Sequence, residues 1–150
     1  MAEPSSSTLQ LELVTPERQM VREPGVLSVS LPGREGYLGI LPGHAPLLSE
    51  LKPGELSYTK GQFTHYLCVN WGFAEVLPHR VIVLVETSER PEEIDVERAK
   101  RARQRAEERL RRAGAGDAAI DALRAQAALQ RAMARLEIAE RWARRAGVQP

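Results

Sequence analysis

The 150-residue sequence has little of what several common protein classes require. A single cysteine, Cys68, excludes an internal disulfide. No apolar run reaches the length of about 18 residues that a membrane-spanning helix needs. Aromatic residues make up only 5% of the chain, so the bases of single-stranded nucleic acid would find few side chains on which to stack. The N-terminal MAEPSSSTLQ does not place an apolar segment after a basic one, so we expect no secretory signal.

The motifs of the common catalytic centres are also missing. The chain contains no G-x-x-x-x-G-K-[ST] phosphate loop, no G-x-S-x-G elbow, and no Cys/His cluster with metal-ligand spacing. The glycine-rich stretch GYLGILPGHAPLL (36–48) lies between predicted strands and does not open a helix. We therefore expect no catalytic residue and no metal site. We interpret this stretch as a strand and turn whose bends need Gly36, Gly39 and Gly43.

Charge is distributed unevenly along the chain. Residues 1–94 contain seven basic and twelve acidic side chains, a net charge of −5. Residues 95–150 contain fourteen basic and eight acidic side chains, a net charge of +6. A step of this size indicates two parts with different partners.

The first part has the period of β-structure. LQLELV (9–14) alternates apolar and polar residues, and VLSVSL (26–31) alternates in the same way. Residues 55–70 predict two strands joined at Lys60-Gly61, and residues 72–87 predict two more that turn at residues 78–80. Residues 81–85 are apolar throughout, so we expect both faces of that strand to be buried. Many short strands separated by glycine and proline favour a sandwich or a flattened barrel.

The second part has the period of helices. Asp95 can cap a helix that runs to about Arg112, AGAGD (113–117) interrupts it, and Asp117 can cap a second helix to about Arg145. Alanine-rich seams predict an antiparallel hairpin that is weakly held, because an alanine methyl contributes only about 0.8 kcal/mol on burial. The seam residues are Val96, Ala99, Ala102, Ala106 and Leu110 on the first helix, and Ala118, Ala122, Ala125, Leu129, Ala132, Leu136, Ala139 and Ala143 on the second.

Arginines form one stripe on each predicted helix. The spacing places Arg98, Arg105, Arg109 and Arg112 on one face of the first helix, and Arg124, Arg131 and Arg135 on one face of the second. The spacing alone leaves several interpretations open. The stripes are a solvated helix face, or they meet a phosphate-rich ligand, an acidic protein surface or nucleic acid. Nucleic acid is the weaker candidate, because the first part is acidic and poor in aromatics.

Three segments carry a resemblance to a known family. GYLGILPGHAPLL with LKPGEL, then NWGFAEVLPHRVIVLVETSER, then IDVERAKRARQRAEERL resemble the epsilon subunit of bacterial F-type ATP synthases. The resemblance covers about residues 9–142. It implies an α+β fold in which a β-sandwich of about ten strands is followed by an antiparallel two-helix hairpin. The implied boundaries are a flexible N-terminus at 1–8, the sandwich at 9–90 and the hairpin at 91–150.

The resemblance also implies a function. Such a subunit is a non-catalytic part of the rotating central stalk, couples proton translocation to ATP synthesis, and inhibits ATP hydrolysis by extending its hairpin. Its partners are the gamma subunit, the c ring and the alpha/beta hexamer, and it lies on the cytoplasmic face of the bacterial inner membrane without spanning it. The alternative is an ATP-sensing module, without strong inhibitory action, whose hairpin is held compact by ATP.

Two sets of site residues follow from the resemblance. No cofactor is required, but the motif I/L-D-x-x-R-A, here Ile94–Ala99, implies regulatory ATP held by Glu89, Asp95, Arg98, Ala99, Arg105, Arg131 and Arg135. The motif can equally be retained for hairpin packing, with negligible ATP affinity. Contacts to gamma or the c ring are implied for Tyr37, Leu38, Gly39 and His44. Many members have glutamate where this chain has Tyr37, which puts an ion pair there in doubt.

Overall fold

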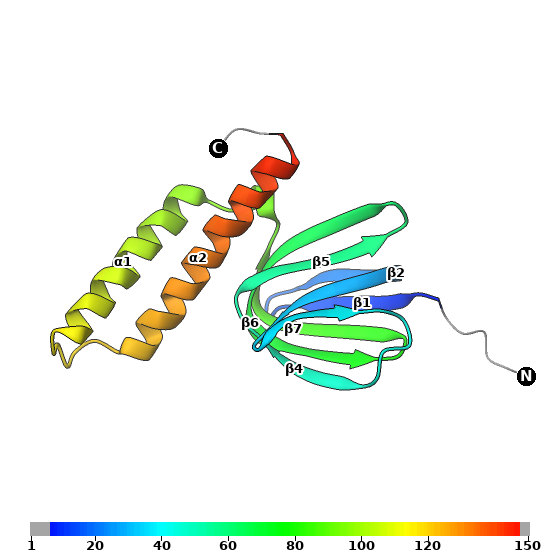
Figure 1. Ribbon diagram of the computed structural model, residues 1–150, viewed down its shortest axis with the longest axis horizontal. Coiled ribbons are helices and arrows are strands. Elements are labelled where there is room, and N and C mark those ends of the chain that lie inside the picture. The colour runs from blue at the N-terminus through cyan, green and yellow to red at the C-terminus, as the bar shows by residue number, and fades with distance from the viewer. Residues whose placement is uncertain (1–6, 148–150) are drawn as a thin grey trace, which may run out of the picture. The chain divides into compact units, whose positions relative to one another are not determined.

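The computed structural model describes residues 7–147 and consists of two compact units that divide between Glu89 and Arg90 (Figure 1). The predicted flexible N-terminus is residues 1–8. Only residues 7 and 8 of it are among the described residues, so this prediction lies largely outside them. Within the described range, no helix combines the length and the apolar character needed to cross a membrane.

The first unit is a β-sandwich, so the predicted fold class is confirmed. Its strands form one continuous sheet in the order β1-β7-β6-β4-β2-β3, with β5 pairing β2 and β6, and with β1 also pairing β2. The described residues contain seven strands where about ten were expected, because β2 and β6 are each 15 residues long and change neighbours along their length. The strands are β1 (Leu9–Val14), β2 (Gln19–Gly33), β3 (Gly36–Ile40), β4 (Leu47–Leu51), β5 (Gly54–Lys60), β6 (Phe63–Leu77) and β7 (Arg80–Glu89).

The core is built from the alternating residues of these strands. Leu9, Leu11 and Leu13 of β1 are buried, as the period-two pattern predicts, and pack with the buried valines of β7. The expectation that both faces of β7 are buried is wrong, because Leu84 is 53% exposed. β7 is central by hydrogen bonding, since it lies between β1 and β6, but only one of its faces is turned to the core. The unbroken apolar run at residues 81–85 therefore led to the wrong prediction that both faces of β7 are buried.

The glycine-rich stretch forms β3, a turn and β4. Gly36 and Gly43 adopt positive φ angles of 139° and 83°, a region that other residues rarely enter. The backbone N–H of Gly43 donates to the carbonyl of Pro78 over 2.7 Å, which ties this turn to the β6–β7 turn. Gly39 is an ordinary strand residue without a positive φ, so the prediction that it permits a bend is wrong.

The second unit contains a 3-10 turn, η1 (Pro91–Glu93), and two helices, α1 (Val96–Gly114) and α2 (Ala122–Arg145). Asp95 caps α1 as predicted, because its carboxylate accepts from the backbone N–H of Arg98 over 3.0 Å. The prediction that Asp117 caps the second helix is wrong: Asp121 does so, accepting from the N–H of Arg124 over 3.1 Å. Asp117 belongs to the interhelix loop, so α2 begins later than expected.

The helices contain buried residues that follow the predicted alanine seam in part. Ala99 and Ala106 are buried on α1, and Ala125 and Ala132 on α2, each pair seven residues apart. Ala118 was placed in the seam but lies in the loop before α2. The one large buried side chain of α2 is Ile138, beside the predicted seam position Ala139. Small buried methyl groups contribute little per residue, so the seam itself stabilises this unit weakly.

Gly72 provides a test of how the sandwich is closed. A Cβ at this position would lie 2.0 Å from the carbonyl oxygen of Leu84 and 2.8 Å from the Cα of Val85, both backbone atoms of β7. We expect Gly72→Ala to lower the free energy of unfolding by at least about 2 kcal/mol, because β6 and β7 must separate. Urea denaturation followed by circular dichroism measures this. Gly39→Ala is the control: no atom lies within 4 Å of its added Cβ, and a change within about 0.5 kcal/mol is expected. Equal midpoints for the two variants would contradict the packing at Gly72.

Candidate functional site

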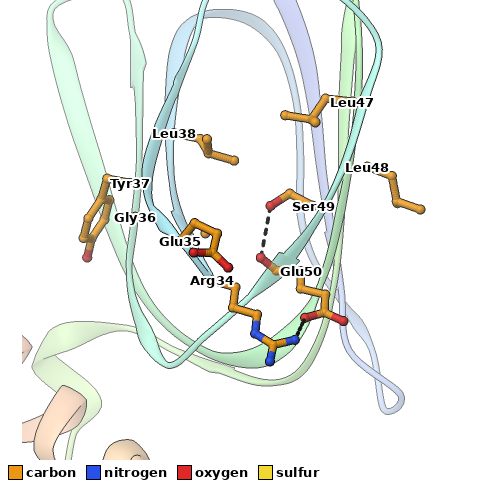
Figure 2. Close-up of a pocket in the computed structure, with 10 residues that line it drawn as sticks. Arg34, Glu35, Gly36, Tyr37, Leu38, Leu47, Leu48, Ser49 and Glu50 are labelled. Carbon is orange, nitrogen blue, oxygen red and sulfur yellow. Dashed lines mark hydrogen bonds and ion pairs between the residues drawn. The ribbon is translucent and has the colours of Figure 1, made fainter.

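The predicted partner-contact residues lie beside a groove in the sandwich unit. The groove has a volume of about 450 Å³ and is lined by residues of β3, of β4 and of the turn between β2 and β3. Figure 2 shows Leu38 on one side of it and Leu47 and Leu48 on the other. Leu48 is 69% exposed. The groove therefore exposes leucine side chains to solvent between β3 and β4.

A charged pair marks one end of the groove. The guanidinium of Arg34 donates to the carboxylate of Glu50 over 2.6 Å (Figure 2), and the backbone N–H of Arg34 donates to the Glu50 carbonyl over 3.0 Å. The side-chain hydrogen bond and the negative charge of Glu50 raise the pKa of the Arg34 guanidinium above its usual value. These two bonds hold the β2–β3 turn against β4. They fix this end of the groove, which Glu35 and Ser49 also line, while the leucines supply its apolar part.

The four predicted contact residues do not all lie together. Tyr37 and Leu38 both line the groove. Leu38 is half-buried, whereas Tyr37 is 55% exposed and Figure 2 shows its ring directed away from the leucines. The Tyr37 hydroxyl accepts a hydrogen bond from the backbone N–H of Glu55 over 3.2 Å. Gly39 is exposed on β3, and His44 is half-buried in the following turn with its Nδ1 2.7 Å from the Ala45 carbonyl. Neither Gly39 nor His44 lines the groove.

The sequence interpretation missed the residues that define the groove. Arg34 and Glu50 are 16 positions apart and meet only because β2 and β4 adjoin at Gly33 and Leu51. No spacing rule connects two residues so far apart on different strands. The adjacent residues Leu47 and Leu48 did indicate an exposed leucine. Successive side chains of a strand point to opposite faces of the sheet, so both cannot face the core.

The predicted ATP residues are distributed over both units. Asp95, Arg98, Ala99 and Arg105 are at the cap and on α1, and Arg131 and Arg135 are on α2. Glu89 is the last residue of β7, in the sandwich unit. One oxygen of the Asp95 carboxylate serves as the helix cap, and the side chain of Ala99 is buried. The structure therefore places the four arginines on the two helices, as the sequence indicated.

Three of these arginines flank the alanine seam. Arg98 precedes the buried Ala99, Arg105 precedes Ala106, and Arg131 precedes Ala132. In an antiparallel pair of helices, equivalent flanking positions lie along the same side of the interface. Arg105 is nine residues before the end of α1 at Gly114, and Arg131 is nine residues after the start of α2 at Ala122, so the two lie at about the same level.

Carboxylates neutralise other basic side chains of the hairpin but not these three. Within residues 7–147, no carboxylate lies within ion-pair distance of Arg98, Arg105 or Arg131. Positive charges aligned in this way repel one another and favour a bound anion. The ion pairs that do form are Lys100–Glu97, Arg103–Glu107, Arg111–Glu108, Arg112–Asp117, Arg141–Glu137 and Arg144–Glu140.

Asp117 fastens the loop that connects the helices. Its carboxylate accepts from the backbone N–H of Ala119 over 3.0 Å and from the guanidinium of Arg112 over 2.8 Å. The hydrogen bond from Ala119 lowers the pKa of the Asp117 carboxyl most, followed by the bond from Arg112. A charged Asp117 therefore stabilises the closed turn between α1 and α2.

Comparison with protein families identifies both units. The model of the ATP synthase delta/epsilon chain β-sandwich domain matches residues 8–91, and that of the delta/epsilon chain long α-helix domain matches residues 92–140. An ATP synthase epsilon chain of Koribacter versatilis is 53% identical over 109 residues, covering 73% of this chain and 76% of that protein. ATP synthase epsilon chain 2 of Syntrophotalea carbinolica is 50% identical over 136 residues, covering 91% and 96%.

A solved structure has a similar fold over most of the chain. A chain of the Euglena gracilis mitochondrial ATP synthase, determined by cryo-EM as OSCP, F1 and c-ring, superposes with a TM-score of 0.78 at 25% identity. The match covers 92% of this chain and 84% of that one.

The lowered pKa of Asp117 predicts how the hairpin responds to acid. A carboxyl whose pKa is lower in the folded state adds stability above its unfolded pKa, and loses that contribution as the pH falls through the folded value. We expect Asp117→Asn to lower the melting temperature of the helices at pH 7, and the difference from the original chain to vanish in strong acid. Circular dichroism at 222 nm across a pH series measures both. Glu92→Gln removes a charge from η1 without touching the loop and is the control. A difference that persists unchanged into strong acid would contradict the assignment.

Proposed function

Because the chain belongs to the delta/epsilon chain family of ATP synthases, we propose that it is the epsilon subunit of the central stalk of such an enzyme. In this role it performs no chemistry of its own and couples proton translocation to ATP synthesis by rotating with the stalk. The supporting observation is that the two domain models match adjacent segments, which together cover residues 8–140. Its partners are the gamma subunit, the c ring and the catalytic hexamer. These partners hold it at the cytoplasmic face of the membrane.

The apolar groove between β3 and β4 is the surface that we assign to contact with the c ring. Its exposed leucines would be unfavourable in water unless a partner covered them. Arg34 and Glu50 pair at that end of the groove and Glu35 lines it beside them, so we assign the docking contact to the leucines and not to these charges. Leu38 remains a contact residue on this assignment. Gly39 and His44 lie outside the groove and remain predictions of a contact with gamma or the ring.

Inhibition of ATP hydrolysis is assigned to the hairpin. Its alanine seam is weak, because a buried alanine methyl contributes about 0.8 kcal/mol against roughly 1.5–3 kcal/mol for a leucine side chain. A helix pair held by such a seam separates at low cost. The extended helices would carry the net positive charge of this half of the chain toward acidic surfaces of the catalytic subunits.

Removal of the hairpin tests inhibition. We expect a chain truncated before Asp95 to raise the ATPase activity of the assembled enzyme several-fold, because the extendable element is gone. ATP synthesis and co-purification of the truncated chain with gamma should be retained, since the sandwich carries the stalk contact. Unchanged hydrolysis in an enzyme that still contains the truncated subunit would show that the hairpin is not inhibitory. Loss of binding to gamma by the full chain would refute the stalk assignment itself.

ATP sensing is the second candidate function, favoured by three arginines that flank the seam and lack carboxylate partners. Arg105 and Arg131, at one level of the hairpin, could hold the phosphates of one nucleotide between the helices, with Arg98 beside the Asp95 cap. Bound ATP would remove the repulsion between these charges and hold the hairpin compact. Arg135 and Glu89 complete the proposed set. Their part stays a prediction, as does that of Ala99.

Calorimetry on the full chain tests this site. We expect Mg-ATP to bind and to raise the melting temperature, and Arg131→Ala to weaken binding about tenfold or more through loss of a charge-assisted hydrogen bond. Arg111→Ala is the matched control, because Arg111 is an arginine of the same hairpin that is paired with Glu108. No heat and no thermal shift at millimolar Mg-ATP would refute ATP sensing. Equal affinities for the Arg131 and Arg111 variants would refute the residue assignment.

A further inference from the structure

The ladder between β2 and β5 stops short of the end of both strands. The last pair in register is Ser30 with Ser57, and continuing the same antiparallel register would place Pro32 opposite Glu55. Pro32 has no N–H to donate. Its carbonyl accepts from the backbone N–H of Lys52 over 3.0 Å and so serves a different neighbour. The backbone N–H of Glu55 donates to a side chain of β3.

Tyr37 supplies this acceptor from the far side of β2. It pairs with Pro32 in the β2–β3 ladder, and its side chain reaches over that proline to β5. The hydroxyl accepts the Glu55 N–H over 3.2 Å. Gly54 permits this approach, because a Cβ there would lie 2.7 Å from the Cβ of Pro32 and 3.3 Å from the Tyr37 hydroxyl. The proline, the glycine and the tyrosine therefore fit together as one arrangement across three strands.

We propose that Tyr37 is a positioning residue that connects β3 across β2 to β5 and thereby sets the β3 wall of the groove. Among residues 7–147, β3 forms a ladder only with β2, so the tyrosine is a second attachment for an edge strand. Leu38 is the next residue and points to the opposite face of the strand, so an anchored Tyr37 fixes the direction in which Leu38 enters the groove. The hydroxyl of Tyr37 bonds to β5, its ring is 55% exposed at the groove, and its positioning effect on docking is made through Leu38.

This inference rests on the proposed docking of the c ring at the groove, but its structural part can be tested without any partner. Amide hydrogen exchange of Glu55 in the isolated full chain reports the hydroxyl contact directly. We expect Tyr37→Phe, which removes only the hydroxyl, to speed exchange at Glu55 about fivefold, in line with the net value of one hydrogen bond. Thr64→Val is the control, because it removes a hydroxyl that contacts Thr59 at the far end of β5. It should leave exchange at Glu55 unchanged.

The second measurement is affinity for a subcomplex of the c ring and gamma, determined well below the melting temperature. We expect Tyr37→Phe to weaken binding about threefold to fivefold, and Thr64→Val to leave it unchanged even if it lowers the melting temperature equally. Unchanged exchange at Glu55 in Tyr37→Phe would overturn the inference, as would unchanged binding despite faster exchange. If both variants weaken binding equally, the loss of affinity comes from lower stability of the sandwich, and the positioning role of Tyr37 is also overturned.

A third variant separates this inference from the proposed docking face. Leu48→Glu places a charge in the groove on β4, away from Tyr37. If it leaves binding intact while Tyr37→Phe speeds exchange at Glu55, the groove is not the docking face and the role of Tyr37 in docking falls with it. If Leu48→Glu abolishes binding and Tyr37→Phe does not affect it, docking at the groove stands and the positioning role is wrong.

Discussion

The pairing of β6 with three other strands is the constraint on which the sandwich depends. This 15-residue strand pairs with β5 over residues 63–69, with β7 over residues 68–77 and with β4 over residues 72–76. The change occurs around Gly72, where the backbone of β7 approaches so closely that no side chain fits. β7 in turn pairs with β1, and β1 with β2, which closes the sheet around one core. The β3–β4 groove exists because β2 and β4 share only one pair, Gly33 with Leu51, and separate beyond it.

The two units are stabilised in different ways. The sandwich buries leucine and valine side chains from most of its strands in one cluster. The buried residues of α1 and α2 are mainly alanines, and much of the remaining order comes from local caps and surface ion pairs, which contribute little each. The sandwich is therefore the more firmly packed of the two units, and the helix pair is held mainly by small contributions.

Charged side chains are arranged differently in the two units. In the sandwich, Arg34 and Glu50 neutralise each other and close one end of an apolar surface. In the hairpin, Arg98, Arg105 and Arg131 flank the seam without carboxylates, although six other basic side chains of the same helices have them. Aligned positive charges beside a weakly packed seam favour an anion, which is the basis of the ATP-sensing proposal. The leucines between β3 and β4 are the basis of the docking proposal.

The sequence by itself determined the fold class, the strands of the core, the turn at Lys60-Gly61 and the cap at Asp95, because local periods and turn chemistry specify these features. It also placed the arginines on two helices. It could not determine that only one face of β7 is buried, since an apolar run records composition and not what covers each face. Nor could it choose Asp121 over Asp117 as the second cap, since both precede alanine-rich segments and the choice depends on the loop that Arg112 and Ala119 fasten.

Only the tertiary structure decided the role of Tyr37 and the existence of the groove. As a sequence position, Tyr37 was expected only to contact gamma or the c ring. In the fold it lies opposite Pro32 and accepts a hydrogen bond from the Glu55 N–H, a group 18 positions away. Arg34 and Glu50 meet in the same way across 16 positions. Hydrogen bonds between distant segments depend on the register of several strands at once, and no local pattern in the sequence records that register.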